Sequence, residues 1–450
     1  MAKKTKEPAA PKPPPEVRYF EQGDRFWELT FADLWLQTRH GKLGSPGQIK
    51  RKDFKAGYEV TYETRKLVAA KTKDGYVEKV GTPPAANTNP ALEKAIAADP
   101  TDEAGYLVYA DWLQAQGDPR GELIALQTAG KPKPAAKLLA RHADSFLGPL
   151  AAHQTCHDGF HDTKQAAWTW KHGFIHAARL AHNQYADSWK GRLATDVLLP
   201  LLRHPSGRFL VELTINENDD PSEDTLDDLV AVIAKHPIPT LRKLRIGDDV
   251  SQISWYRVGN LGKLWAALPG LVDLEIEAGQ FELGTLALPH LRRAVFRTGG
   301  LSKTAAKSIA AASWPALEHL EVYFGDPQYG CTATSKDAIA ILGRTDLKQL
   351  RYLGLKNAMF QGDLIPHFAA SKLVRQLHTL DMSSGILLDE HVDTLLAHKA
   401  AFAHLKVLDV SHSWLTKAGR KRLQGIAGTL LTEGCWDEGD SEYRFVHIGE

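Results

Sequence analysis

The sequence of 450 residues contains only three cysteines, Cys156, Cys331 and Cys435, which lie far apart. This number and spacing exclude a disulfide framework and a Cys-x-x-Cys zinc knuckle. The sequence also lacks any apolar run near the roughly 20 residues that a membrane-spanning helix needs. Its first residues are mostly lysine, proline and alanine, without the apolar segment of a secretory signal. We therefore expect a cytoplasmic protein that makes no contact with a membrane.

Common catalytic motifs are also missing. The sequence contains no Gly-x-x-x-x-Gly-Lys phosphate loop and no Gly-x-Ser-x-Gly nucleophile elbow. Asp409, Ser411 and His412 bring together the residue types of a catalytic triad. Because consecutive residues of a strand point to opposite faces, Ser411 and His412 should not share a hydrogen bond. We expect no enzyme activity, no catalytic residues, no cofactor and no small-molecule substrate.

Charge is nearly balanced over the whole chain, with a net charge of +1, but it is distributed unevenly. Residues 1–80 hold 17 Lys and Arg against 11 Asp and Glu, and residues 39–73 hold 10 against 3. A local excess of this kind favours an anionic partner. A solvated lysine-rich face is the alternative, and composition alone does not decide between the two.

Leucine recurs at a regular spacing through the second half of the chain. The unit Leu-x-x-Leu-x-apolar occurs eight times, with Ala294 replacing the second leucine once: Leu210-Leu213-Ile215, Leu241-Leu244-Ile246, Leu271-Leu274-Ile276, Leu291-Ala294-Phe296, Leu317-Leu320-Val322, Leu350-Leu353-Leu355, Leu377-Leu380-Met382 and Leu405-Leu408-Val410. The first leucines of successive units are 20 to 33 residues apart, which is the period of stacked structural repeats. We predict an α/β solenoid of parallel strands with helical returns at 302–312, 389–397 and 417–426. The 20-residue step after Leu271 is too short for a helix and predicts an extended return through Phe281 and Leu286.

Near the N-terminus, strand patterns at 18–20 and 26–30 flank a Gly-Asp turn, and 58–72 has helical composition before a return strand at 75–77. With the glycine-rich segment 41–48, these stretches resemble a WGR domain over nearly its whole length. The resemblance implies a small α+β fold similar to the DNA-contacting module of poly(ADP-ribose) polymerases. Here the signature Trp-Gly-Arg is replaced by His40-Gly41-Lys42. Lysine cannot pair bidentately with phosphate as arginine does.

A basic stretch follows this signature and supplies the candidate nucleic-acid contacts. They are Arg39, His40, Lys42, Lys50, Arg51 and Lys52. Trp27 is expected to support them from the core of the module. Contact through these residues would be strongly dependent on salt and largely insensitive to sequence. Docking of a protein, or a purely structural role, is the alternative for this module.

Residues 91–130 have a helical pattern, with helices predicted at 91–98 and 103–116 and a glycine stop at Gly117. The run LVYADWL at 107–113 and the run GDPRGELI at 117–124 resemble the repeat-companion domain of planctomycete and myxobacterial proteins. That family has no assigned chemistry. The resemblance therefore implies which other domains occur beside this one, and it implies no activity. Segment 168–175 reads as an irregular first strand and cap of the solenoid.

The leucine units, with the runs at 283–291, 298–301, 314–321 and 404–412, resemble uncharacterised bacterial leucine-rich-repeat proteins, which often carry an N-terminal WGR domain. The segment 443–449 is expected to cap the last repeat. The predicted organisation is a disordered tail (1–15), a WGR domain (16–80), a linker (81–90), a helical companion domain with the solenoid cap (91–200) and a leucine-rich-repeat domain (201–450).

The strand period of two places the residues that flank each second leucine on the face opposite the core. The candidate protein-binding residues on this face are Lys243, Arg245, Glu275, Arg293, Arg297, Glu321, Tyr323, Tyr352 and Lys356. Acidic neighbours on the same face include Asp273, Glu277, Asp381 and Asp409. Because the signs alternate between strands, two interpretations stay open: a mixed-charge surface that recognises a protein, or a surface that neutralises itself through lateral ion pairs.

A possible metal cluster lies at His153, Cys156, His157 and His161. His157 and His161 have the helical spacing that suits zinc, but the Asp158-Gly159 pair between them favours a turn. We therefore predict no metal site. The function predicted from the sequence is a non-enzymatic adaptor that recognises a protein through its repeats and uses the WGR domain as a second contact. A nucleic-acid sensor that acts through the WGR domain is the alternative.

Overall fold

The computed structural model describes residues 16–32, 34–42, 48–79, 87–153, 166–181, 193–216, 226–247, 253–437 and 444–449. The contacts within the chain divide it into two compact units, residues 1–86 and 87–450. The division falls within the segment 81–90, where prolines and small residues predict a linker. Each unit is described by itself.

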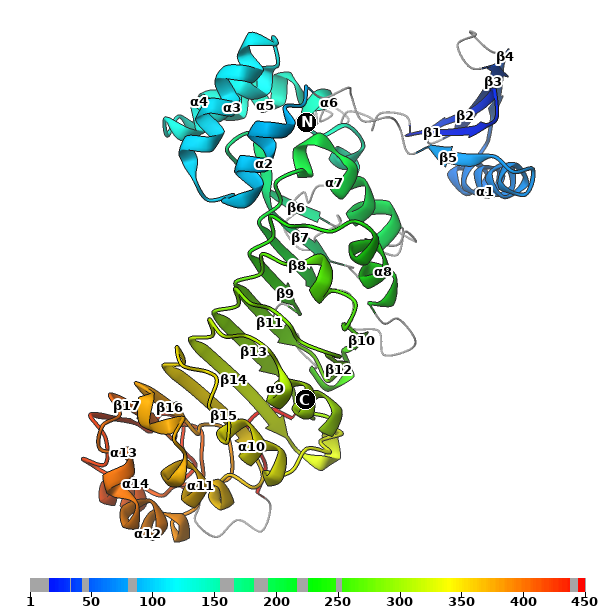
Figure 1. Cartoon of the computed structure of the whole chain (residues 1–450). Helices are drawn as coiled ribbons and strands as arrows, with labels where there is room; N and C mark the ends of the chain where they lie inside the picture. Colours follow the sequence, from blue (N-terminus) through cyan, green and yellow to red (C-terminus); the bar gives the residue numbers. More distant parts are fainter. Residues whose placement is uncertain are drawn as a thin grey trace, which may run out of the picture. The chain divides into compact units, whose positions relative to one another are not determined.

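The first unit is a five-stranded antiparallel sheet with one helix (Figure 1). Its strands are β1 (Glu16–Gln22), β2 (Arg25–Ala32), β3 (Trp35–Lys42), β4 (Gln48–Asp53) and β5 (Val77–Lys79), and its helix is α1 (Gly57–Lys73). The strand order is β4-β3-β2-β1-β5. Phe20, Trp27, Leu29 and Leu36 of the sheet are buried together with Val60 of α1. The helix therefore covers one face of the sheet, and β4 forms an edge.

The second unit begins with a set of short helices. They are α2 (Pro90–Ala98), α3 (Glu103–Ala115), α4 (Pro119–Thr128), α5 (Pro132–Arg141) and α6 (Ala143–Phe146). Asn89, Asp102 and Asp118 accept hydrogen bonds from main-chain N–H groups in the first turns of α2, α3 and α4, as N-caps do. Gly117 has φ +72°, the left-handed conformation that lets α3 stop and α4 begin.

A single sheet runs through the rest of this unit and contains eleven strands among the described residues (Figure 1). The strands are β6 (Ala166–Lys171), β7 (Phe174–Ala181), β8 (Glu212–Asn216), β9 (Lys243–Ile246), β11 (Asp273–Glu277), β13 (Arg293–Arg297), β14 (His319–Gly325), β15 (Tyr352–Ala358), β16 (Thr379–Asp381), β17 (Val407–Asp409) and β18 (Thr429–Leu431). β6 and β7 form an antiparallel hairpin, and each later strand pairs in parallel with the one before it.

The leucine units set the register of this sheet. The second leucine of each unit lies opposite its counterpart in the next strand, as in the pair Leu213–Leu244 and the pair Leu380–Leu408. Every residue of this row from Leu213 to Leu408 is at most 1% exposed. Burial of a leucine side chain contributes about 1.5–3 kcal/mol, so a shift by one residue would expose the whole row and is strongly disfavoured.

The segments that connect the strands differ in length and form. Helical connections are α7 (Leu199–Arg203), α8 (Asp227–Lys235), α9 (Lys303–Ala311), α10 (Ser335–Leu342), α11 (Ile365–Ala370), α12 (Glu390–Ala397), α13 (Lys399–Phe402) and α14 (Lys417–Arg422). Between β11 and β13 the return is extended and contains β12 (Gln280–Glu282), which pairs with β10 (Arg257–Asn260). The expected extended return through Phe281 is confirmed.

Arg120 fastens the helices to the first hairpin of the long sheet. Its side chain is 6% exposed. Its guanidinium donates to the carbonyl oxygen of Gly173, in the turn between β6 and β7, and to Ser206 Oγ at 2.9 Å. The guanidinium also lies 5.1 Å from the ring centroid of Phe146 and 4.8 Å from that of Phe174. Helices and sheet therefore pack as parts of one unit.

The C-terminal segment Arg444–Gly449 turns back along the sheet, and Figure 1 shows the C-terminus beside its middle strands. Val446 is 3% exposed and packs in a cluster with Ile386 and Trp414. The described part of this segment therefore packs at the ends of β15, β16 and β17, whereas the sequence predicts that it caps the last repeat.

No helix among the described residues is both long enough and apolar enough to cross a membrane.

Candidate functional site

The six basic residues predicted to contact nucleic acid lie on β3 and β4, but they are divided between the two faces of the small sheet. Leu36 marks the face that packs on α1, and residues two apart on a strand share a face. His40 and Lys42 on β3, with Lys50 and Lys52 on β4, lie on this helix side. Arg39 and Arg51 lie on the opposite, open face, so the six residues do not form one patch.

Arg39 is held firmly by its neighbours on the open face. Its Nε and Nη2 atoms donate to the two carboxylate oxygens of Glu28 at 2.9 and 2.6 Å. Its guanidinium lies 4.8 Å from the centroid of the Phe26 ring, which stacks on Tyr19. The hydrogen bond to Glu28 raises the pKa of Arg39. The two hydrogen bonds that the Arg39 guanidinium could donate to a phosphate are therefore already donated to Glu28, and Arg39 acts mainly as a structural residue.

The cations of strand β4 are more exposed to solvent than Arg39. All six of its residues are exposed. Arg51 pairs with Asp53 at 3.3 Å and Lys52 with Glu63 at 3.3 Å, and the side chains of the two cations remain 50% and 58% exposed. Exposed ion pairs of this length contribute at most about 1 kcal/mol. Arg51 and Lys52 can therefore exchange these partners for phosphate oxygens, and Lys50 is exposed on the same strand.

An aromatic ring lies beside these cations. The Arg51 guanidinium is 4.2 Å from the centroid of the Trp35 ring on β3. A cation over an aromatic face is held by about 0.5–1 kcal/mol at an exposed site. Trp35 was not among the residues predicted from the sequence; in the structure it lies opposite Asp53 across β3 and β4.

The nine residues predicted to bind protein all lie on one face of the long sheet, on β9, β11, β13, β14 and β15. We call this face, with its acidic neighbours Asp273, Glu277 and Asp381, the polar strip. The strip is contiguous because the strands pair in register. The structure thus brings the predicted set together.

Ion pairs join the first half of the polar strip. Arg293 Nη1 lies 3.0 Å from both Asp273 Oδ1 and Glu275 Oε2. Arg245 lies 3.5 Å from Glu275 and 3.8 Å from Glu277, and Arg297 lies 3.7 Å from Glu277. Each arginine of the strip thus has a carboxylate on a neighbouring strand, which supports the interpretation that this surface neutralises itself.

A second cluster is centred on Lys356. Its Nζ atom lies 2.6 Å from Asp381 Oδ2 and 3.4 Å from Glu321 Oε2. Asp381 also accepts a 2.5 Å hydrogen bond from the Tyr352 hydroxyl, and its side chain is 1% exposed. Burial alone would lower the pKa of Lys356, but the charges of Asp381, Tyr323 and Glu321 together outweigh it and raise that pKa. Asp381 was not among the predicted site residues, yet it is the most buried charge of the strip.

We expect a Glu321→Gln variant to reveal the pH dependence of this cluster. Burial would raise the pKa of Glu321, but hydrogen bonding to His319 and the charge of Lys356 lower it to about 2 from its usual 4.5. The stabilisation from ionised Glu321 is therefore complete above pH 4.5 and is lost as pH falls toward 2. Melting temperatures measured from pH 6 to pH 2.5 should show Glu321→Gln below wild type at pH 6 and a gap that closes with acid. A gap independent of pH would contradict this account.

Asp409, Ser411 and His412, which have the residue types of a catalytic triad, do not contact one another in the manner of a triad. Asp409 accepts a hydrogen bond from the main-chain N–H of Ser411, and Ser411 Oγ accepts one from Glu433. The His412 ring instead stacks on His447 with 4.3 Å between ring centroids. The contacts of Ser411 and His412 thus run in different directions.

The possible metal cluster cannot be placed, because Cys156, His157 and His161 lie outside the described residues. Within the part of the chain that the structure describes, no group of three or more His, Cys, Asp or Glu residues has the geometry to hold a metal ion.

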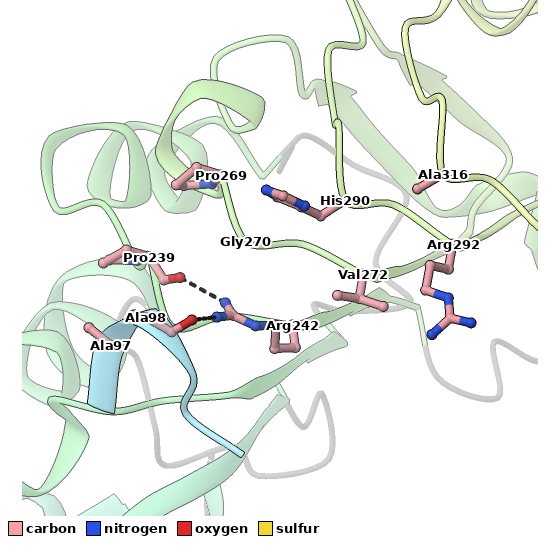
Figure 2. Close-up of a pocket in the computed structure, with 10 residues that line it drawn as sticks. All are labelled: Ala97, Ala98, Pro239, Arg242, Pro269, Gly270, Val272, His290, Arg292 and Ala316. Carbon is pink, nitrogen blue, oxygen red and sulfur yellow. Dashed lines mark hydrogen bonds between the residues drawn. The ribbon is translucent and has the colours of Figure 1, made fainter. Parts of the chain in front are cut away.

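A cavity of about 550 Å³ opens where α2 ends against the N-terminal ends of several strands (Figure 2). Figure 2 shows Arg242 at its centre, donating to the carbonyl oxygens of Pro239 at 2.8 Å and Ala98 at 3.3 Å. Arg292, on its rim, is paired with Glu318 at 2.6 Å. Because both cations already have partners and much of the wall is proline, alanine and valine, we assign no ligand to this cavity.

Comparison with known proteins agrees with this description. A solved structure of a Bacteroides fragilis protein from a structural genomics consortium is similar over 96% of this chain and 99% of that one, with a TM-score of 0.52 and 20% identity, a likeness that shows the fold alone. The uncharacterized protein YfeS of Escherichia coli (strain K12) is 34% identical over 62 residues, which is 14% of this chain and 25% of YfeS. This chain therefore matches about a quarter of that relative. The model of the WGR domain family matches residues 17–83, and these residues form a WGR domain.

Proposed function

We propose that this chain is a non-enzymatic adaptor whose WGR domain holds a nucleic acid by its phosphate backbone. The observation that best supports this proposal is the exposure of strand β4. It is an edge strand, all six of its residues are exposed, and three of them are consecutive cations, Lys50, Arg51 and Lys52. Binding of nucleic acid by WGR domains supports the proposal. The weak ion pairs of Arg51 and Lys52, both 3.3 Å long, leave these side chains free to move onto phosphates.

The contacts available on β4 favour recognition of the backbone over recognition of bases. Arg39 keeps its guanidinium on Glu28, and position 42 carries lysine in place of the signature arginine. Lysine acts toward phosphate as a point charge without a fixed geometry. Contacts of this kind fix a nucleic acid in place and carry no sequence information. We therefore infer binding that depends on salt and tolerates any sequence.

Reversing the three cations, in the variant Lys50→Glu/Arg51→Glu/Lys52→Glu, should weaken binding of duplex DNA by more than about tenfold at 50 mM salt. Fluorescence anisotropy with a labelled 20-base-pair duplex, and in parallel a nicked duplex and a single strand, measures the effect. The matched control reverses three exposed cations of α1, Arg65, Lys66 and Lys73, and so changes the net charge equally. Equal weakening by both variants, or no binding by wild type at low salt, would refute the proposal.

For the second unit we infer a leucine-rich-repeat solenoid that recognises a protein, with the helices at 90–141 as the companion domain of the repeats. The register of the leucine row supports the solenoid, as does the single long sheet of parallel strands. Solenoids present extended binding surfaces more often than they build reactive pockets. A cytoplasmic location is part of this proposal. The polar strip is a weaker candidate for the protein contact, because its charges already pair with one another.

A further inference from the structure

Residues 444–449 lie against the long sheet as a bound peptide would. The segment crosses the ends of successive strands, because it contacts Trp414 after β17, Ser384 after β16 and Asn357 at the end of β15. Neighbouring strands are about 4.8 Å apart and an extended chain spans about 3.4 Å per residue. A six-residue segment can cross several strands only if it is extended.

The positions that receive this segment form a regular row in the sheet. Asn357, Ser384 and His412 each follow the second leucine of their unit by four residues. Their φ angles are +56°, +67° and +53°, a left-handed conformation that is uncommon for residues other than glycine. Held in this conformation at adjacent strands, all three contact the segment. We call this row, with Ser254, Ile386, Trp414 and Trp436, the end groove.

The end groove contacts its occupant mainly through hydrogen bonds to main-chain atoms. The Asn357 amide donates to the carbonyl of Ile448 at 2.6 Å and accepts from its N–H at 2.9 Å. The carbonyl of Ser384 accepts from the His447 N–H at 2.9 Å. The Trp414 indole donates to the carbonyl of Phe445 at 3.0 Å, and Ser254 Oγ donates to that of Gly449. Hydrogen bonds to main-chain groups would form with any extended peptide of suitable side chains.

Two positions of the occupant are selected by their side chains. Val446 is 3% exposed and fills a space between Ile386 and Trp414. A Cβ atom at Gly449 would lie 2.3 Å from the Tyr329 ring, so only glycine fits there without displacement of that ring. Phe445, by contrast, is 47% exposed, although its ring contacts Trp414 and Trp436.

We propose that the end groove is a binding site for an extended peptide of another protein. The peptide carries an aliphatic residue where Val446 lies and glycine three residues later, as in the chain's own Val-His-Ile-Gly. Segment 444–449 occupies the groove in cis and limits access to it. The contacts support this role over that of a simple end cap, because the segment contacts residues at the ends of β15, β16 and β17, which precede the last strand. The proposal does not depend on nucleic-acid binding by the WGR domain.

The test uses the peptide Arg-Phe-Val-His-Ile-Gly, labelled with fluorescein and blocked at both ends, and measures anisotropy. The chain truncated after Asp437 should bind it saturably, at least about tenfold more tightly than the full chain does. Asn357→Ala in the truncated chain, or valine in place of the peptide's glycine, should weaken binding at least about tenfold. Absence of saturable binding by a truncated chain with the melting temperature of the full chain would overturn the proposal.

A second variant covers the case in which truncation prevents folding. Val446→Asp in the full chain buries a carboxylate against Ile386 and Trp414 and should release the segment. This variant should bind the labelled peptide more tightly than wild type, and affinity equal to wild type would overturn the proposal. Light scattering on the same samples reports self-association. Concentration-dependent dimers in wild type that disappear with Val446→Asp would assign the groove to a second copy of this chain and would also overturn the proposal.

Discussion

Replacement of Lys356 by methionine should destabilise the second unit by about 3–5 kcal/mol, the usual effect of removing one partner from a buried ion pair. Methionine has a similar length, so loss of packing is small. The loss comes from Asp381 and Glu321, which lie 2.6 and 3.4 Å from the Lys356 ammonium and are only 1% and 13% exposed. Without the ammonium, two carboxylates stay close together in a site with little water.

A double-mutant cycle separates this electrostatic effect from packing. Asp381→Asn keeps an oxygen that can accept from the N–H of Ser383, as Asp381 Oδ1 does at 2.9 Å. Lys356→Met/Asp381→Asn should therefore be more stable than Lys356→Met alone. Urea unfolding followed by tryptophan fluorescence measures both, with Lys348→Met as the control at an exposed position. If Lys356→Met changed the urea midpoint no more than Lys348→Met, the polar strip would not be the self-neutralising network described above.

Arg120→Leu should destabilise the same unit by about 2–5 kcal/mol through a different mechanism. Arg120 has no carboxylate at ion-pair distance among the described contacts; it donates instead to the carbonyl of Gly173 and to Ser206. Leucine would leave that carbonyl without its donor and would remove the cation from between Phe146 and Phe174. Burial lowers the pKa of Arg120 to about 10, so the side chain is still charged at neutral pH.

Arg292→Leu is the matched control for Arg120→Leu. Arg292 is 59% exposed and pairs with Glu318 at 2.6 Å, and an exposed pair contributes at most about 1 kcal/mol. Thermal unfolding should therefore show a large decrease in melting temperature for Arg120→Leu and a small one for Arg292→Leu. Equal decreases would mean that the helices at 90–141 are not fastened to the sheet through Arg120.

Eight strands of the long sheet, from β8 to β17, could be predicted from the sequence because each buries the leucines of one Leu-x-x-Leu-x-apolar unit. The same local pattern identifies α9 and α12. The bounds of α9, Lys303–Ala311, differ from the predicted 302–312 by one residue at each end, and those of α12, Glu390–Ala397, differ from the predicted 389–397 by one residue at the start. The last strand of the sheet, β18, was missed. Its Leu430 is preceded three residues earlier by Ala427 and not by leucine, so the period gave no signal there.

Contacts between residues distant in sequence could not be predicted in the same way. Local charge density groups Arg39 with Arg51, but only the register with β2 shows that Arg39 lies opposite Glu28 and is already paired. Segment 444–449 has no periodicity, and its contact between Ile448 and Asn357 joins residues 91 positions apart. The alternation of side chains along each strand did predict that the residues of the polar strip share one face. The ion pairs that neutralise the strip could be seen only in the structure.

The salt dependence of duplex affinity tests the central claim, that β4 holds phosphates, most directly. Each phosphate that a cation neutralises contributes about −0.9 to the slope of log affinity against log salt concentration. Contacts from Lys50 and Lys52, which share one face of β4, predict a slope near −1.8 for wild type, or about 12-fold weaker binding at 200 mM than at 50 mM salt. The slope should approach zero in the triple reversal at positions 50–52 and stay unchanged in the α1 control. A slope that is the same in wild type and the triple reversal would contradict the account.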